Sequence, residues 1–300
     1  MTITQAPRDI QPQSRVGQAN IPAAIAGLFQ ALRERGVRYC HWKSNLRLLN
    51  GLQGQTDLDL LIDPQHMALF KQILADHGVK PVRAAPGREY PGLENYLAFD
   101  SASGTLFHLH VHYQLVLGEQ FVKNYRLPLE AQFLSSTQQE HGVFIPVPEL
   151  ELIVLSLRAL LKYRDRDVIK DCLTIRYPGL PEHIVNEIMW LLEQTSIARV
   201  SQRLAELGDI VPGDAILEFL KIVVATPRAG YRLFRLRQRV RASLRQHQRS
   251  NRLRATAIYF HELWRRRNTF LRFTPSRHMT MPGGGMTLAL VGADGAGKST

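Results

Sequence analysis

The period of the apolar residues changes near residue 147, and this change divides the chain into two regions of different fold class. Before that point, apolar and polar residues alternate in short stretches such as Thr56–Asp63, a pattern typical of β-strands with one buried face. From Pro148 to about Arg272 the apolar residues recur with the period of an amphipathic α-helix. We therefore expect a small mixed α/β unit over residues 21–147 and an all-helical region over residues 148–280.

Individual elements follow from the same patterns, with Gly and Pro marking their ends. In the first unit we expect helices over Ile21–Gly36 and Pro64–Gly78, strands over Val37–Trp42 and Thr56–Asp63, and a hairpin over Glu94–Leu117. In the second we expect helices over Glu149–Tyr163, Pro181–Gln194, Ser196–Leu207 and Asp214–Ala225. Residues 1–20 are typical of a disordered polar tail, and residues 281–300 are expected to form a glycine linker and the start of another domain.

Positive charge is concentrated in one segment. The net charge is +12, and Arg228–Arg277 alone carries 15 Arg, no Lys and a single acidic residue, Glu262. The segment also contains the aromatic residues Phe260 and Trp264. It is predicted either to lie on an anionic membrane surface or to contact an acidic partner. A solvated helical face is the simpler alternative, and nucleic-acid binding is the less favoured one.

No stretch approaches the length of an uncharged membrane-spanning helix, and the N-terminus lacks the apolar core of a signal peptide. The two cysteines, Cys40 and Cys172, are far apart and form no metal-binding motif. We expect a cytoplasmic protein, with a peripheral position at a membrane as the alternative.

Asp57 and Asp59 lie two positions apart on a predicted strand, so their side chains share one face while Leu58 and Leu60 share the other. Two carboxylates this close repel each other unless a cation neutralises them, and Mg²⁺ is the usual partner. We therefore predict a Mg²⁺ site at Asp57 and Asp59. A solvated edge strand of alternating polarity is the simpler interpretation that the pattern leaves open.

The residues before this strand add to the pattern, because Lys43-Ser44 ends the preceding strand thirteen positions before Asp57. This layout resembles the nucleotidyltransferase superfamily, in which a Gly-Gly or Gly-Ser pair precedes an Asp-x-Asp strand. More closely, Val37–Tyr113 resembles uncharacterised bacterial nucleotidyltransferase-like domains, some of which are fused to P-loop kinase domains. The resemblance implies that Lys43 and Ser44 hold the triphosphate of a nucleotide substrate, and that Asp57 and Asp59 bind the metal and act in catalysis.

Two positions depart from the superfamily pattern. Lys43 replaces the usual glycine, so a close approach of the backbone to phosphate is less assured, although the ammonium group supplies charge. His110 stands where a third carboxylate is expected, and histidine is a poor ligand for Mg²⁺. Three alternatives therefore stay open: an active nucleotidyltransferase, a degenerate module that senses a nucleotide without turning it over, and a site that uses a different metal.

Three histidines, His108, His110 and His112, alternate along the same predicted strand and so share one face. Zn²⁺ accepts imidazole ligands, but side chains on one strand diverge and rarely complete a tetrahedron alone. The preferred interpretation is the polar face of a hairpin. If the nucleotidyltransferase resemblance holds, this face looks into the nucleotide cleft and His110 contacts phosphate or base.

A phosphate-binding motif, G-x-x-x-x-G-K-[ST], closes the sequence directly after an apolar stretch. Its glycines let successive N–H groups turn toward an anion, Lys298 supplies a cation for the outer phosphates, and the Ser299 hydroxyl is suited to bind Mg²⁺. We predict that ATP and Mg²⁺ bind here through Gly292, Asp294, Gly295, Ala296, Gly297, Lys298, Ser299 and Thr300.

The sequence of this loop resembles the P-loop of thymidylate kinases and related nucleoside monophosphate kinases, and the resemblance covers Met286–Thr300 only. The resemblance implies a phosphotransferase in which Asp294 lies near the acceptor nucleotide. Because the helix after such a loop lies downstream, we expect this chain to be the front part of a longer protein and not to act as a kinase by itself. The predicted function is thus an ATP-binding kinase fused to a nucleotidyltransferase-like domain. The alternatives are a nucleotide-sensing or interaction module and an Arg-rich membrane-surface scaffold.

Overall fold

A mixed five-stranded sheet forms the centre of the first region in a computed structural model that describes residues 21–84, 89–90, 92–119, 122–163, 180–225, 230–267 and 279–282. The strand order is β1-β2-β5-β4-β3, and β2 and β5 are parallel whereas the other neighbours are antiparallel. The strands are β1 (Tyr39–His41), β2 (Leu58–Ile62), β3 (Lys80–Val82), β4 (Leu93–Asp100) and β5 (Thr105–His112). The register places Asp59 opposite His110, and His110 opposite Asn95.

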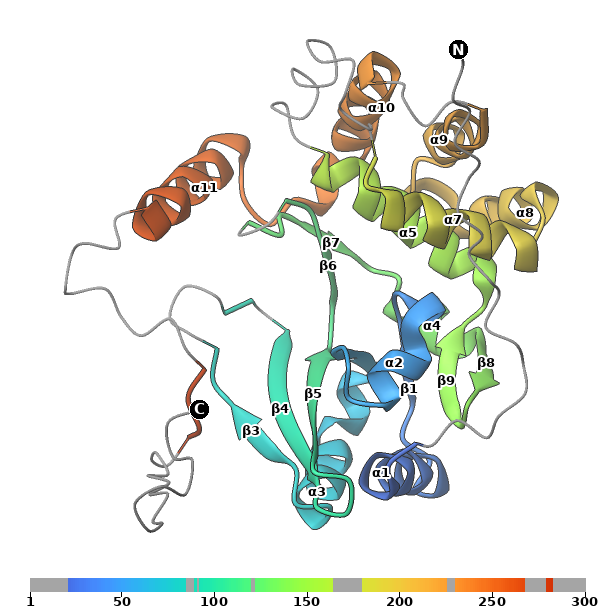
Figure 1. Cartoon of the computed structure of the whole chain (residues 1–300). Helices are drawn as coiled ribbons and strands as arrows, with labels where there is room; N and C mark the ends of the chain where they lie inside the picture. Colours follow the sequence, from blue (N-terminus) through green and yellow to red (C-terminus); the bar gives the residue numbers. More distant parts are fainter. Residues whose placement is uncertain are drawn as a thin grey trace, which may run out of the picture.

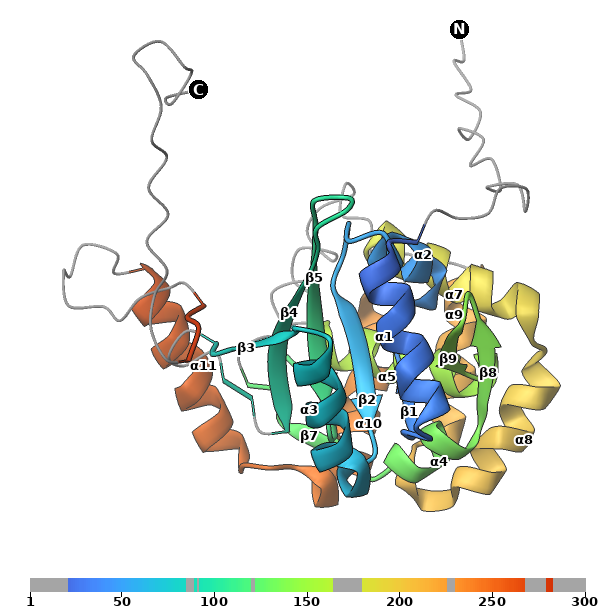
Figure 2. The same cartoon turned by 90° about the horizontal axis from the view of Figure 1, so that it is seen from below.

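Helices α1 (Ala23–Glu34) and α3 (Met67–Asp76) cover one face of the sheet (Figures 1 and 2). Alternate residues of β2 and β5 supply the apolar surface on this face, and they pack with the apolar stripes of both helices. The strand residues are Leu58, Leu60, Ile62, Phe107, Leu109 and Val111. Because the apolar residues occupy one set of alternate positions, the intervening polar residues of β2 and β5 project from the opposite face.

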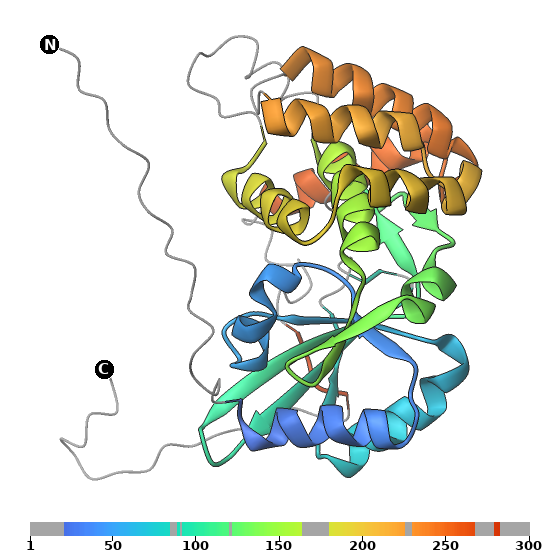
Figure 3. The same ribbon diagram turned by 90° about the vertical axis from the view of Figure 1, so that its right-hand side faces the viewer.

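The helical region stands over that opposite face (Figure 3). Its central helix, α5 (Pro148–Lys162), is buried along most of its length, and it contacts four other helices. These are α7 (Glu182–Gln194), α8 (Ile197–Leu207), α9 (Gly213–Ala225) and α10 (Gly230–Ser243). One apolar cluster contains residues of all five helices and also Cys40, Trp42 and Leu61 of the sheet region, so packing continues across the predicted boundary near residue 147.

The remaining strands form two ribbons, one of β6 (Leu115–Leu117) with β7 (Tyr125–Leu127) and one of β8 (Thr137–Glu140) with β9 (Val143–Pro146). The remaining α-helices are the short α2 (Leu48–Leu52) and α4 (Glu130–Ser135) and the longer α11 (Arg252–Arg267). Single 3₁₀ turns lie at Asn45–Arg47, Pro64–His66, Gly208–Ile210 and Leu244–His247. The described residues thus contain ten α-helices, and the mixed α/β class predicted from the sequence is confirmed.

Most predicted elements are present, with shifts at their ends. The predicted Glu94–Leu117 hairpin is formed by β4 and β5, but its last residues leave the sheet at Tyr113 and pair with β7 instead. The predicted tail and the P-loop lie outside the described residues. Within the described part of the chain, no helix is both long and apolar enough to cross a membrane.

The arginine-rich segment divides into two helices with different surroundings. On α10, Arg237 is almost completely buried, and its guanidinium lies 2.6 Å from the Glu119 carboxylate. On α11, which lies apart from the other helices in Figure 1, Leu253, Phe260 and Trp264 are exposed. Part of the positive charge is therefore structural, whereas contact of α11 with a membrane or an acidic partner stays a prediction.

Candidate functional site

The two aspartates predicted as metal ligands lie in different surroundings, Asp57 directly before β2 and Asp59 within it. Both project from the face opposite α1 and α3, as the alternating pattern predicts. The Asp57 side chain is 49% exposed and the Asp59 side chain only 12%. The pair is therefore not symmetrical, since Asp57 is open to solvent and Asp59 is enclosed.

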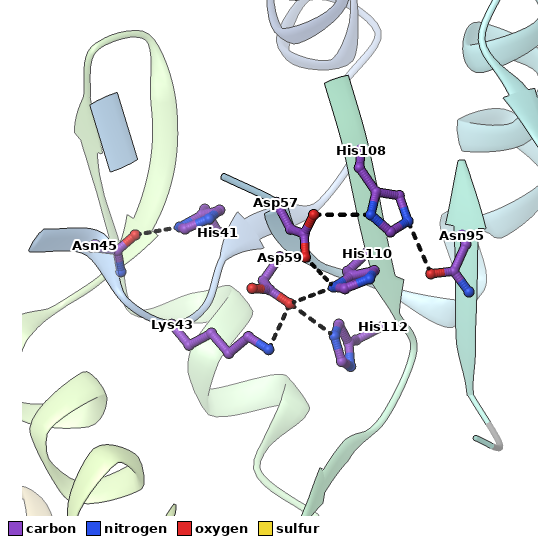
Figure 4. A network of polar contacts seen from close by, with 9 residues as sticks. All are labelled: His41, Lys43, Asn45, Asp57, Asp59, Asn95, His108, His110 and His112. Atoms are coloured by element: carbon purple, nitrogen blue, oxygen red, sulfur yellow. Dashed lines mark hydrogen bonds and ion pairs between the residues drawn. The ribbon is translucent and has the colours of Figure 1, made fainter. Parts of the chain in front are cut away.

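Asp59 is held by three nitrogen atoms that converge on its Oδ1 atom (Figure 4). Lys43 Nζ lies 2.6 Å away, and His110 Nδ1 and His112 Nε2 each lie 3.4 Å away. Burial by itself raises the pKa of Asp59, but the Lys43 ammonium and these imidazoles hold it well below its usual range. Asp59 is thus a fixed anion that is already paired with a cation.

Asp57 instead faces two imidazoles (Figure 4). Its Oδ1 lies 2.9 Å from His108 Nδ1, and its Oδ2 lies 3.6 Å from His110 Nδ1. The hydrogen bond with His108 lowers the pKa of Asp57. On the other side of its ring, His108 Nε2 lies 3.2 Å from Asn95 Oδ1 of β4. One potential ligand atom each from Asp57, His108 and His110 lie within 4.8 Å of one another.

His112 and the neighbouring Trp42 form the apolar side of the site. Burial lowers the pKa of His112 to about 4, so its ring is neutral at physiological pH. The His112 ring meets the Trp42 ring edge to face, with their centroids 5.1 Å apart. Trp42 in turn lies against two cations, because Lys43 Nζ is 5.1 Å and the Arg158 guanidinium 5.6 Å from its ring centroid.

The turn that carries Lys43 and Ser44 is fixed from the helical region. Glu151 of α5 accepts hydrogen bonds from the backbone N–H of Asn45 at 2.9 Å and from its side-chain amide at 2.6 Å. Asn45 Oδ1 lies 2.6 Å from His41 Nδ1, which extends this contact to the end of β1. Ser44 adopts a left-handed conformation with φ of 60°. The predicted phosphate-binding turn therefore depends on α5 for its shape.

Three further cations gather beside Lys43. Lys123 precedes β7, while Arg158 and Lys162 lie on the last turns of α5. Burial, together with the positive charges of Lys43, Lys162 and Arg158, lowers the pKa of Lys123 to about 7. The same repulsion between like charges acts on Lys162, although its side chain is more exposed than that of Lys123. The site therefore combines a fixed carboxylate, an open carboxylate and a surplus of positive charge.

Sequence reasoning identified the strand residues of this site but missed Glu151, Arg158, Lys123 and Asn95. Arg158 leaves one signal, since it is the only charged residue in the run Ile153–Leu161, where an unpaired arginine is costly to bury. Glu151 leaves a similar signal on a helix whose neighbours are apolar. Nothing in the sequence near Lys123 indicates that it lies beside residues of β2.

The remaining predicted site residues, Gly292–Thr300, lie outside the described residues. A cavity of about 810 Å³ lies between α10 and α11, but neither Asp57 nor Asp59 lines it. Its walls include the guanidinium-bearing side chains of Arg241 and Arg245 and the aromatic rings of Tyr259 and Phe260. No family model, curated protein or solved structure matches the chain.

Proposed function

We propose that the sheet face carrying Asp57 and Asp59 binds a nucleoside triphosphate together with a divalent cation and transfers a nucleotidyl group from it. The observation that supports this most is the cluster of four cations, Lys43, Lys123, Arg158 and Lys162, beside the two aspartates. Among the described residues, the Lys43–Asp59 contact is the one ion pair that this cluster makes with a carboxylate. The other three cations repel one another, and an anionic ligand relieves that repulsion.

A polyphosphate suits this charge distribution better than a single carboxylate does. Arg158 presents a planar guanidinium, which can donate two hydrogen bonds to phosphate oxygens, while Lys43 and Lys123 act as point charges. The half-exposed Asp57 carboxylate lies beside this cluster and repels phosphate unless a cation lies between them. A divalent ion at Asp57 would supply that positive charge and stabilise the charge that develops on the phosphoryl group during transfer.

The protein's own residues then have separate roles in the proposed reaction. Asp59 keeps Lys43 charged and in place, as the 2.6 Å contact indicates. Glu151 and Asn45 hold the turn at Ser44, next to Lys43 in the sequence. His110, which lies within 3.6 Å of both aspartates, occupies the position where the nucleotidyltransferase resemblance implies a third carboxylate. A histidine at this position favours a second candidate function, that of a module that binds the nucleotide without catalysing its reaction.

Removing a cation from the cluster is expected to weaken polyphosphate binding. In a Lys298→Ala background, Arg158→Ala or Lys123→Met should lower the affinity for tripolyphosphate and Mg–ATP by at least about tenfold each, since each loses a charged hydrogen bond. Affinity should also fall as the pH rises through about 7, because Lys123 then loses its proton, and this dependence should be weaker in Lys123→Met, where Lys162, with a pKa lowered to about 8, is left. Isothermal titration measures both effects.

The matched control is Lys221→Ala, which removes an exposed lysine of α9 that is not part of the cluster and should leave affinity unchanged. Equal affinities in the Lys298→Ala parent and in its Arg158→Ala and Lys123→Met derivatives would rule out the proposed phosphate site. Tight binding without release of pyrophosphate, with any nucleotide acceptor offered, would favour the sensing module over the transferase.

For Gly292–Thr300 we propose ATP–Mg²⁺ binding of the P-loop type, on the sequence motif alone. In the intact protein carrying Arg158→Ala, the further change Lys298→Ala should lower ATP affinity by about 10–100-fold, because the loop loses its mobile cation. Equilibrium dialysis with labelled ATP tests this expectation. Unchanged affinity would remove the P-loop assignment, and with it the proposed kinase activity, without affecting the sheet site.

A further inference from the structure

We propose that Asp57, His108 and His110 bind a transition-metal ion of the Mn²⁺ to Zn²⁺ series, in preference to Mg²⁺. This inference rests on the proposed function only in placing the ion beside the phosphate cluster; the ligand geometry stands by itself. The three side chains lie on the open part of the sheet face, partly exposed and reachable by an ion from solvent (Figure 4).

His108 lies between a carboxylate and an amide oxygen, and one tautomer of its neutral ring directs a nitrogen lone pair at the carboxylate. In the tautomer in which Nε2–H donates to Asn95 Oδ1, at 3.2 Å, neutral His108 has its lone pair on Nδ1. That atom lies 2.9 Å from Asp57 Oδ1, which is also an acceptor. Two acceptors at this distance need a positive species between them, either a proton or a metal ion. A ligating histidine whose other nitrogen donates to a carbonyl oxygen is the usual arrangement at protein metal sites.

The distances agree with ligation by one ion. Two atoms that each lie about 2.1 Å from a metal are about 3.0–3.4 Å apart when the angle between them is between a right angle and the tetrahedral angle. The separations here are 2.9 Å between His108 Nδ1 and Asp57 Oδ1, and 3.6 Å between His110 Nδ1 and Asp57 Oδ2. One potential ligand atom from each of the three residues lies within 4.8 Å of the other two. Side-chain rotations that bring the two imidazole nitrogens closer together would place them and an Asp57 oxygen around one ion.

The same contacts explain why the ion is not expected to be Mg²⁺. Mg²⁺ requires mainly oxygen ligands in near-ideal octahedral geometry. Lys43 already occupies Asp59 Oδ1 at 2.6 Å, so only the Asp57 carboxylate is open, and the other two donors are imidazole nitrogens. Imidazole combined with carboxylate suits ions from Mn²⁺ to Zn²⁺. A phosphate oxygen of a ligand bound by the cation cluster could complete the coordination of such an ion.

The test is metal titration of the whole chain after chelator treatment, without nucleotide. We expect one tightly bound Co²⁺ or Zn²⁺ per chain at this site, and visible d–d bands of Co²⁺ that report nitrogen ligation. Asp57→Asn, His108→Ala and His110→Ala should each lower Co²⁺ and Zn²⁺ affinity by at least about 10–100-fold and weaken these bands. His183→Ala, which removes an exposed histidine of α7, is the matched control.

A further variant tests the selectivity of the site between metal ions rather than the loss of metal binding. His110→Asp provides a second accessible carboxylate and removes one imidazole, so the affinity for Mg²⁺ relative to Co²⁺ should increase by at least about tenfold. Circular dichroism verifies that each variant is folded. The proposal is overturned if His108→Ala and His110→Ala bind Co²⁺ and Zn²⁺ as tightly as the wild type does. It is also overturned if His110→Asp leaves selectivity unchanged.

The outcome is independent of the polyphosphate measurements. Loss of Co²⁺ binding in the His108 and His110 variants together with wild-type tripolyphosphate affinity in Arg158→Ala would support the metal site and reject the proposed function. Cation-dependent tripolyphosphate binding without any dependence of metal affinity on the histidines would do the reverse.

Discussion

Replacing Asp59 with alanine is expected to lower the free energy of unfolding by about 3–5 kcal/mol, as breaking a buried ion pair from one side generally does. The reason is that Lys43 Nζ, 2.6 Å from Asp59 Oδ1, stays enclosed beside Trp42 with its main counter-ion removed. The positive charges of Arg158 and Lys123 nearby increase the cost. Urea denaturation followed by circular dichroism measures the change.

Asp57→Ala is the matched control for this experiment, because it removes the same group two positions earlier on the same face. Its side chain is 49% exposed, so the expected change is within about 1 kcal/mol. The double variant Lys43→Met/Asp59→Leu should recover much of the lost stability, since both buried charges are removed together. Equal effects of Asp57→Ala and Asp59→Ala would contradict the asymmetry between the two aspartates.

The second large effect is expected at Arg237, whose side chain is 1% exposed on α10. Arg237→Ala should destabilise the protein by about 3–5 kcal/mol, because the change leaves a cavity among the apolar residues of α10 and removes the 2.6 Å contact to Glu119. Thermal and urea unfolding provide the measurement. A loss of stability of this size would identify Arg237, although it belongs to the arginine-rich segment, as a core residue.

Arg235→Ala tests the same helix at an exposed position and should change stability by no more than about 0.5 kcal/mol. If Arg237→Ala were as mild as Arg235→Ala, the contact with Glu119 would have no part in holding α10 against the β6–β7 ribbon. If instead both were severe, the basic face of α10 would be covered by a partner rather than by water.

Local periodicity was enough to predict the strands that carry the site. Alternation placed Asp57 and Asp59 on one face of β2, and His108, His110 and His112 on one face of β5, and the contact between His110 and both aspartates confirms that these faces are the same. The helices of the second region were predicted for the same reason, because a buried stripe leaves a clear period in the sequence.

The charges that surround the aspartates could not be predicted in this way. Glu151 contacts Asn45 across 106 positions, and Lys123 and Arg158 reach Lys43 from other elements. Such contacts depend on how the helical region is placed over the sheet, which no local pattern records. The difference in burial between Asp57 and Asp59 has the same origin, since it depends on which end of β2 is covered.

The parallel pairing of β2 with β5 has a consequence for folding. The hairpin of β4 and β5 brings together residues that are close in sequence, whereas Asp57 and His108 are 51 positions apart and meet only when β2 joins β5. Closing so long a loop costs entropy before any contact offsets it, so this step is expected to be slow compared with hairpin formation. A refolding chain would therefore acquire native-like secondary structure first, and competence to bind its ligand only when the last long-range pairing is complete.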